Sequence, residues 1–298
     1  MSEAHDTKLT AGERERYRAN HAYFRAADPR PAGDPWDSQL LLKHARVTVL
    51  GVGGAGSHAA WSLAAAGVGS VHLVDPGRVE EPHLAWQSLY TEADLGRPKA
   101  EVAARRLTAV NSMGRHTYEA RRADTEEALT ALVRDCDVFA LCTDGMDGMD
   151  GMDGAGGTGG ADGADGTDGD RIREAASRVC VTLGVPWVCA GTDGLLATVG
   201  VYAPEGPCFE CVAAGEGERP EPGRKPSPAP APVAGVCGQL VAHEVVSLLT
   251  GIATTPPGYV RGLHLNAPDQ HVFVRHPARP DCRSCHPQAG CPADQAPT

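Results

Sequence analysis

The stretch Val47-Thr-Val-Leu-Gly-Val-Gly-Gly-Ala-Gly56 decides the fold. Its first four residues are apolar or β-branched and predict a short strand, and the turn that follows has the spacing G-x-G-x-x-G at Gly51, Gly53 and Gly56. Glycine at these positions permits a tight turn, close approach of the backbone to a phosphate group, and close packing of helix on strand. Residues 57–66 are Ala-rich and predict a helix, whose N-terminus presents free N–H groups to an anion. The stretch therefore predicts a nucleotide-binding turn.

The segment that follows completes a strand–helix–strand unit. Val71-His-Leu-Val-Asp75 predicts a second strand, which implies parallel pairing and a right-handed crossover. Asp75 lies 19 residues past Gly56, where a carboxylate can accept hydrogen bonds from ribose hydroxyls. A glycine turn that only packs a helix on a sheet is the alternative. The flanking strands and the acidic residue favour nucleotide binding, but they do not separate a dinucleotide from a nucleoside triphosphate.

The rest of the chain continues the alternation of strands and helices. Apolar runs predict strands over residues 138–142, 187–190, 198–202, 260–265 and 271–275. Helical patterns cover residues 13–27, 98–110, 171–183 and 239–249. The last two strands are expected to be antiparallel. We therefore predict an α/β fold, Rossmann-like and doubly wound, with a mainly parallel sheet and a C-terminal antiparallel edge.

Composition shifts predict the organisation of the chain. We expect an N-terminal helical arm and linker over residues 1–40, one domain over residues 41–286, and a disordered tail over residues 287–298. Within the domain, a Gly/Asp-rich insert (145–170) and a Pro-rich crossover loop (215–232) are predicted to be disordered. Their few apolar residues cannot offset the entropy cost of ordering.

Charge and hydropathy exclude some classes of function. The 298-residue chain has a net charge of −11 and no block of Lys or Arg, which argues against binding to nucleic acid. Residues 1–34 lack the apolar stretch of a signal peptide. We expect no window to approach the roughly 18–20 apolar residues of a membrane span. These features predict a soluble, cytoplasmic protein that is not bound to a membrane.

Ten cysteines in a cytoplasmic chain favour metal binding or catalysis over disulfides. Cys208 and Cys211 form one C-x-x-C pair, and Cys282 and Cys285 form a second. Two such pairs supply four thiolates for a tetrahedral Zn²⁺. The long separation suits a structural zinc clip that ties the end of the chain to the main sheet. The alternatives are disulfides or four unrelated thiols.

Several motifs occur in an order typical of one protein family. They are Gly51-Val-Gly-Gly-Ala-Gly-Ser57, Ala66-Gly-Val-Gly69, Leu73-Val-Asp75, Leu95-Gly-Arg-Pro-Lys-Ala100, Asn111 and Cys142-Thr-Asp144. From about Arg46 to Cys285 the chain resembles the E1-like activating superfamily, of the ThiF/MoeB/HesA type, which also has the two cysteine pairs. Enzymes of that family use ATP to adenylate the C-terminal carboxylate of a small protein or peptide.

The resemblance implies an adenylyltransferase that forms acyl-AMP and releases pyrophosphate, with ATP, Mg²⁺ and structural Zn²⁺. The implied partner is a ubiquitin-like sulfur carrier protein or a ribosomally made precursor peptide, and the implied assembly is a homodimer. The implied nucleotide-binding residues are Gly51, Gly53, Gly54, Gly56, Asp75, Gln87, Lys99 and Asp144.

Individual roles follow from the same resemblance. It places Gly54 against the phosphates, Asp75 on the ribose and Gln87 beside the ATP. Lys99 pairs with phosphate oxygens, and Asp144 holds Mg²⁺ near the α-phosphate. The positive charges of Lys99 and of the Mg²⁺ ion can stabilise the transition state that forms when a carboxylate attacks phosphorus. The alternatives are that Lys99 is a solvated lysine at a helix start and that Asp144 is a turn residue.

The resemblance also implies a third catalytic residue. The Gly/Asp-rich insert displaces the arginine that follows Thr-Asp in the family. We place that arginine at Arg173, with Arg171 as the alternative.

The sequence departs from the family pattern near the expected phosphate site. His83 and Trp86 stand where the family has Asn and Arg, and that Arg normally contacts the triphosphate. In the N-terminal arm, Ala19 stands where an Arg usually reaches the ATP of the partner subunit. Either Arg16 or Arg18 substitutes for it, or both belong to an exposed charged helix.

A further departure concerns the thiol used by sulfur-transfer members. Residues 226–232 hold no cysteine, although the family's thiol lies in this loop. Cys237 lies in the expected helix start Gly235-Val-Cys-Gly238, where a helix N-terminus would lower the pKa of its thiol. The favoured alternative is a buried packing cysteine. An enzyme that stops at the acyl-adenylate then fits at least as well as one that forms a thioester.

Two other functions stay open at the level of sequence. An NAD-dependent oxidoreductase would explain the glycine turn, but not Lys99 or the cysteine pairs. A degenerate E1-like scaffold that binds a peptide or carrier without activating it would explain the losses at His83, Trp86 and Ala19.

Overall fold

The computed structural model describes residues 8–27, 34–143, 168–215, 227, 229–267, 269–282 and 284–285. Asp144, nearly all of the Gly/Asp-rich insert, most of the Pro-rich loop and the C-terminal tail lie outside the described residues. The predictions of disorder for those segments therefore stay predictions.

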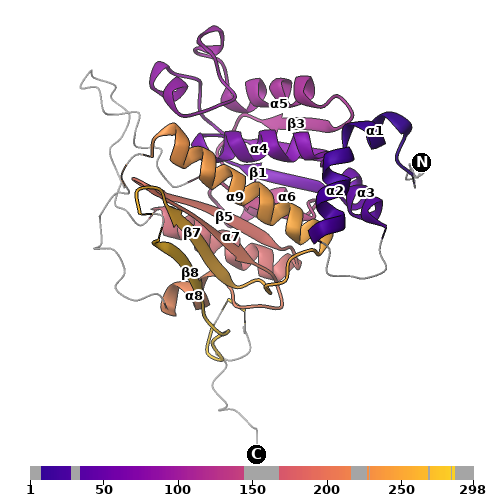
Figure 1. Cartoon of the computed structure of the whole chain (residues 1–298). Coiled ribbons are helices and arrows are strands. Elements are labelled where there is room, and N and C mark those ends of the chain that lie inside the picture. Colours follow the sequence, from indigo (N-terminus) through magenta and orange to yellow (C-terminus); the bar gives the residue numbers. More distant parts are fainter. Residues whose placement is uncertain are drawn as a thin grey trace, which may run out of the picture.

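One eight-stranded sheet forms the centre of the molecule, with the strand order β3-β2-β1-β4-β5-β6-β7-β8 (Figure 1). The strands are β1 (Arg46–Leu50), β2 (Ser70–Val74), β3 (Arg115–Glu119), β4 (Val138–Leu141), β5 (Trp187–Asp193), β6 (Leu196–Tyr202), β7 (Tyr259–His264) and β8 (His271–Arg275). Pairing is parallel from β3 through β5 and antiparallel from β5 through β8. The predicted fold class, with its antiparallel C-terminal edge, is confirmed.

Helices cover both faces of this sheet (Figure 1). One face carries α2 (Arg18–Ala27), α3 (Pro35–His44), α4 (Gly54–Ala66), α5 (Lys99–Val110) and α9 (Ala231–Thr250). The other face carries α6 (Glu126–Val133), α7 (Asp168–Leu183) and α8 (Phe209–Gly215). Two apolar cores result, one between the sheet and each helical layer. The strand order reverses between β1 and β4, and ligands of open α/β sheets bind at such a switch point.

Small residues let α4 and α9 pack closely. A Cβ atom at Gly238 of α9 would lie 2.4 Å from the backbone oxygen of Ala55 and 3.0 Å from the backbone nitrogen of Ala59, both on α4. Only glycine fits such a distance between two helix backbones. The Ala-rich composition of α4 therefore serves this contact as well as its helix propensity.

Helix α9 differs from its prediction in two ways. It begins at Ala231 rather than at Gln239, and so includes Gly235 and Cys237. By length and composition it is also apolar enough to cross a membrane, with a mean hydropathy of 1.4 over an 18-residue window. The expectation that no such window exists is therefore wrong. Since 56% of that window is buried against the sheet and α4, α9 has the character of a core helix.

Strand β3 and the helices α3, α6 and α8 escaped the sequence patterns. Strand β3 reads Arg-His-Thr-Tyr-Glu, a polar composition that only an edge strand tolerates. Helix α6 has eight residues, too few for a clear apolar period. In the arm, Tyr17 separates α1 (Ala11–Arg16) from α2, so the predicted single helix is two. The predicted boundary at residue 40 falls inside α3.

Candidate active site

A cavity lies at the carboxyl ends of β1 and β4, at the switch point of the sheet. Most of the residues singled out in the sequence meet here. The lining includes Gly51, Gly53, Gly54, Asp75, Gln87 and Lys99, together with Arg78, His83, Trp86, Arg122, Asp124, Thr143, Ile172, Thr192, Ala229 and Ala234.

The glycine turn forms the floor of this cavity. Gly51 has a φ of 90°, in the left-handed region that favours glycine. A Cβ at Gly56 would lie 1.9 Å from the Gly51 oxygen, so only glycine lets α4 leave the turn at this angle. Helix α4 begins at Gly54, and Gly53 at its N-cap offers no side-chain hydrogen bond. The first N–H groups of α4 are therefore available to an anion.

Asp75 is fixed at the end of β2 by two backbone groups. Its Oδ2 accepts a hydrogen bond from the Val52 N–H (2.8 Å), and its Oδ1 accepts one from the Gly77 N–H (2.7 Å). The side chain is nearly buried, yet it lines the cavity. The carboxylate is thus held in one orientation beside the glycine turn.

Lys99 approaches the same point from the start of α5. Its backbone N–H donates to the Gly77 oxygen (2.9 Å), which joins α5 to the loop after β2. A Cβ at Gly77 would lie 3.0 Å from Asp75 Oδ1 and 3.3 Å from Lys99 Nζ. The acid and the ammonium group therefore both lie close to the same side of Gly77, and both residues line the cavity.

Gln87 contributes an unsatisfied acceptor. The residue is 3% exposed, and its Oε1 is buried without a hydrogen-bond partner within the described part of the chain. A Cβ at Gly53 would lie 3.8 Å from its Nε2, so the amide lies against the glycine turn. An orphaned buried acceptor costs about 1–3 kcal/mol, and a ligand N–H can recover this.

Two predicted catalytic residues are not placed in this cavity. Asp144 lies outside the described residues, although the preceding Thr143 lines the cavity. Of the described start of α7, Ile172 lines the cavity and Arg171 and Arg173 do not. Arg173 instead contacts Asp170, with Nη1 3.4 Å from Oδ1. The catalytic role of Arg173 therefore stays a prediction.

Sequence reasoning missed the polar pair Arg122 and Asp124. They line the cavity from the loop after β3, with Arg122 Nη1 3.4 Å from Asp124 Oδ2. Because β3 was not predicted, nothing placed this loop at the carboxyl edge of the sheet. Recognition of β3 as a parallel strand would have placed this loop at the cavity, because the loops after parallel strands meet at one edge of the sheet.

The departures from the family pattern take defined positions. The ring of Trp86 lies against the glycine turn, because a Cβ at Gly54 would be 2.6 Å from its Cε3. His83 lies on the 3₁₀ helix η1 (Glu81–Ala85), and its Nε2 is 3.5 Å from Lys99 Nζ. Both replacements therefore line the cavity beside the predicted phosphate site.

The arginines of the arm bond within their own chain. Arg16 donates to the Val110 oxygen, and Arg18 pairs with Glu15 at 3.7 Å while it stays largely exposed. Asn111 is buried and donates to the Tyr17 hydroxyl and to the Ala64 oxygen, both at 2.8 Å. This family-motif residue thus anchors the arm to α4.

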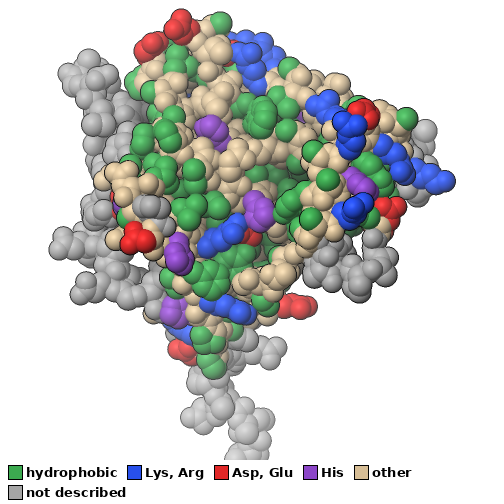
Figure 2. All heavy atoms as spheres, in the orientation of Figure 1, with side chains coloured by type: hydrophobic (Ala, Val, Ile, Leu, Met, Phe, Trp, Pro, Cys, Tyr) green, Lys and Arg blue, Asp and Glu red, His purple; other side chains and the backbone are tan. Residues whose placement is uncertain are grey.

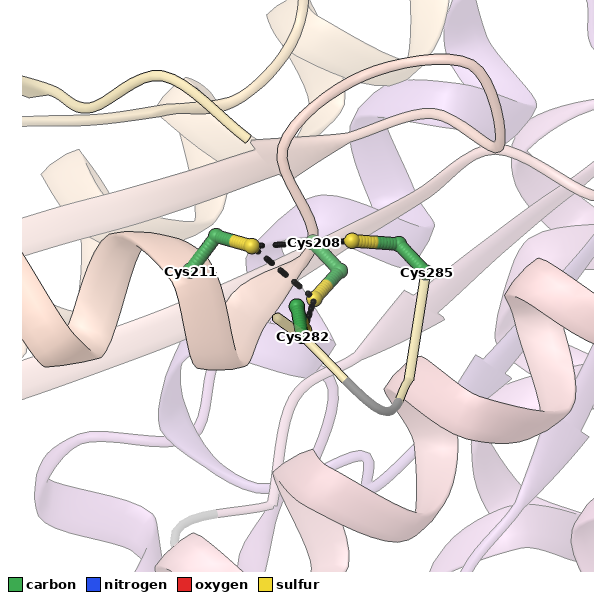
Figure 3. Close-up of side chains that lie close together, drawn as sticks. All are labelled: Cys208, Cys211, Cys282 and Cys285. Carbon is green, nitrogen blue, oxygen red and sulfur yellow. Dashed lines mark hydrogen bonds between the residues drawn. The ribbon is translucent and has the colours of Figure 1, made fainter. Parts of the chain in front are cut away.

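The four predicted cysteine ligands converge at the start of α8 (Figure 3). Their sulfur atoms all lie within 4.8 Å of one another, and Figure 3 shows the thiols pointing inward. The Cys208–Cys211 sulfur distance is 3.7 Å, and the Cys208–Cys282 and Cys211–Cys285 distances are 3.5 Å.

This geometry fits a metal ion. A tetrahedral ion about 2.3 Å from each sulfur places the sulfurs roughly 3.8 Å apart. Burial raises the pKa of the Cys208 thiol, and that of Cys285 to about 11, so adjacent thiolates need a cation between them. The Arg279 N–H also donates to Cys211 Sγ (3.3 Å). The set can hold a metal ion and leaves no position for a substrate.

Cys237 does not lie at a helix N-terminus. It is the seventh residue of α9, fully buried, and its thiol donates to the Thr198 oxygen of β6 (3.3 Å). The favoured interpretation as a packing cysteine agrees with this position. The lowered pKa expected at a helix start has no basis here, because the helix begins at Ala231.

Comparisons with known proteins agree with this geometry. The ThiF family model matches residues 29–150 and 164–286. The sulfur carrier protein ThiS adenylyltransferase of Escherichia coli (strain K12) is 33% identical over 227 residues, which cover 76% of this chain and 80% of that protein. The molybdopterin-synthase adenylyltransferase of the same organism is 30% identical over 235 residues, which cover 76% of this chain and 82% of the relative.

Solved structures with the same fold include E. coli MccB with ATP, with a TM-score of 0.70 and 23% identity over 91% of this chain and 74% of that chain. E. coli MccB with MccA-N7isoASN has a TM-score of 0.73 and 22% identity, covering 94% and 76% of the two chains. PaaA has a TM-score of 0.72 and 21% identity, covering 94% and 79%. At these identities the likeness concerns the fold.

Proposed function

Since this chain belongs to the ThiF family and its curated relatives are adenylyltransferases, we propose that it activates the C-terminal carboxylate of a small carrier protein or peptide as acyl-AMP. One observation carries the proposal. Lys99, Asp75 and the orphaned amide oxygen of Gln87 converge on a glycine turn at the switch point of the sheet.

The chemistry follows from the charges in the cavity. A carboxylate oxygen of the substrate bonds to the α-phosphorus of ATP, and the bond from that phosphorus to the bridging β-oxygen breaks, which releases pyrophosphate. Negative charge grows on the phosphoryl oxygens, where Lys99 and the N-terminus of α4 can stabilise it. Asp75 accepts from the ribose hydroxyls, and Gln87 Oε1 accepts from an N–H group of the adenine.

Two metal ions belong to this proposal. The four cysteines hold Zn²⁺ as a structural clip between α8 and the C-terminal segment. Mg²⁺ is assigned to Asp144 by resemblance, and Thr143, the preceding residue, lines the cavity. Bound Mg²⁺ neutralises phosphate charge.

The lining of the cavity includes the small residues Thr192, Ala229 and Ala234, and Ala234 lies near Gly54. In this proposal these small side chains leave room for the end of a polypeptide. We propose a peptide or an unusual carrier as the substrate, because residues 226–232 lack a cysteine and Cys237 is buried. The acyl-adenylate then passes directly to another nucleophile. Related proteins are described as acting on the sulfur carrier ThiS, which supports a carboxylate substrate of this kind.

We also propose a homodimer that forms through the face of α4 and α9. Pro232, Val236 and Leu240 follow one outward stripe of α9, and Trp61 of the neighbouring helix α4 is 46% exposed. Figure 2 shows hydrophobic side chains, with scattered His, Lys and Arg, across this view of the molecule. A second copy would cover this apolar surface.

ATP–pyrophosphate exchange tests the proposed activity. With a suitable carrier or peptide, we expect wild-type protein to incorporate labelled pyrophosphate into ATP. Lys99→Met should slow this exchange by about 100-fold or more, because the charge that stabilises the transition state is lost. Arg105→Met, on the same helix and outside the cavity lining, should exchange normally.

The exchange assay, combined with measurements of peptide and NAD binding, separates the two rival functions. Tight peptide binding without any exchange would favour an inactive scaffold. Binding of NAD in place of ATP would favour an oxidoreductase.

A further inference from the structure

A further positively charged side chain, that of Arg78, lines the cavity from the loop after β2. Arg78 directly follows Gly77, the glycine that Lys99 Nζ approaches. The Nη1 group of Arg78 donates to the Gly96 oxygen at 2.7 Å. A guanidinium group has several N–H donors, so this single bond orients the group and leaves other donors for a ligand.

Backbone pairing holds Arg78 against the segment that leads into α5. Arg78 and Pro98 form an antiparallel bridge, and the Val79 N–H donates to the Arg97 oxygen at 2.9 Å. Lys99 is the first residue of α5 and directly follows this bridge. The side chains of Arg78 and Lys99 therefore start from two paired segments whose backbones are fixed relative to each other.

The charges of Arg78 and Lys99 are not neutralised by an ion pair. Across the described residues, no carboxylate lies within ion-pair distance of either side chain, although Glu80 also lines the cavity. Arg122 differs from them, because its Nη1 lies 3.4 Å from Asp124 Oδ2. Two cations without acidic partners in one cavity attract a ligand that carries several negative charges.

We propose that Arg78 is a second phosphate-binding residue, whose guanidinium donates to a phosphate oxygen of ATP beside Lys99. The planar group with its several donors suits the oxygens of a phosphate. This inference rests on the proposed function, because it takes ATP as the ligand. Lys99 was predicted from a sequence motif, whereas Arg78 is assigned from its position in the cavity and its lack of an ion pair.

Three variants separate a phosphate contact from an effect on the backbone or on Lys99. Arg78→Met removes the charge and the donors but keeps an unbranched side chain. Arg97→Met is the matched control, because Arg97 lies in the paired segment, bonds to Glu101 at 2.7 Å and is outside the cavity lining. The double variant Arg78→Met with Lys99→Met shows whether Arg78 acts through Lys99.

Calorimetric titration of the full chain with Mg·ATP and with adenosine, at low ionic strength, provides the measurement. We expect Arg78→Met to raise the Kd for ATP about tenfold, which corresponds to the loss of one hydrogen bond between charged groups. The Kd for adenosine, which has no phosphate, should stay within about twofold of wild type. Arg97→Met should bind both ligands within about twofold of wild type.

The double variant gives the sharper test. If Arg78 contacts phosphate itself, adding Arg78→Met to Lys99→Met should weaken ATP binding by a further fivefold or more, roughly as for independent contacts. A further change below about twofold would mean that Arg78 only positions Lys99, which would overturn the inference.

Two other results also overturn the inference. If Arg78→Met binds ATP as tightly as wild type, or loses adenosine affinity to the same extent, Arg78 makes no phosphate contact. Both results leave the proposed function intact, whereas wild-type protein that does not bind ATP would contradict the proposed function as well.

Discussion

At the scale of single residues, Asp75 and Lys99 bring opposite charges to one cavity from the ends of β2 and α5. Gly51, Gly56 and Asp75 are placed by the strands on either side of them, and the structure brings them together. The catalytic role of Arg173 stays a prediction, because Asp144 and residues 145–167 lie outside the described part of the chain. Cys237 was ambiguous, since its burial depends on the true start of α9.

The cysteine ligands give a residue-scale prediction. We expect wild-type protein and Cys291→Ser to hold about one Zn²⁺ per chain, and Cys282→Ser to hold none. Loss of the ion should lower the melting temperature of Cys282→Ser by about 5–10 °C, because metal binding contributes to folding free energy. Metal analysis of the purified proteins and thermal unfolding measure these effects. A zinc-free wild-type protein, or a Cys282→Ser variant that keeps its zinc, contradicts the assignment.

At the scale of elements, apolar periodicity predicted the central strands and long helices. It failed for β3, whose polar residues suit an edge strand, and for the first two turns of α9, where Pro232 and Gly235 suggest a loop. Packing against α4 overrides that local signal. A Cβ at Gly238 would meet the α4 backbone, so the glycine reflects helix packing.

The outer surfaces of α4 and α9 give an element-scale prediction. We expect the wild-type protein to sediment at twice 31.0 kDa and Trp61→Glu to sediment as a monomer, because a charge would be buried in the apolar interface. Tyr118→Glu changes a comparably exposed aromatic residue on the edge strand β3 and should stay dimeric. Analytical ultracentrifugation measures the mass. A monomeric wild-type protein, or a dimer that Trp61→Glu leaves intact, would contradict the proposed interface.

At the scale of the whole molecule, the topology explains why distant segments form one site. Parallel strands β1, β2, β3 and β4 bring their following loops to one edge, and the antiparallel strands extend the sheet toward the cysteine cluster. The order of the motifs along the chain predicted this architecture, and the family match confirms it. The identity of the substrate lies beyond the fold, because relatives with this fold carry different named partners.

A crystal structure with a non-hydrolysable ATP analogue and Mg²⁺ tests the central claim most directly. The account predicts adenosine beside Asp75 and Gln87, and a triphosphate that runs from the N-terminus of α4 to Lys99. Density for the analogue at another surface, or an empty cavity at saturating concentration, would contradict it.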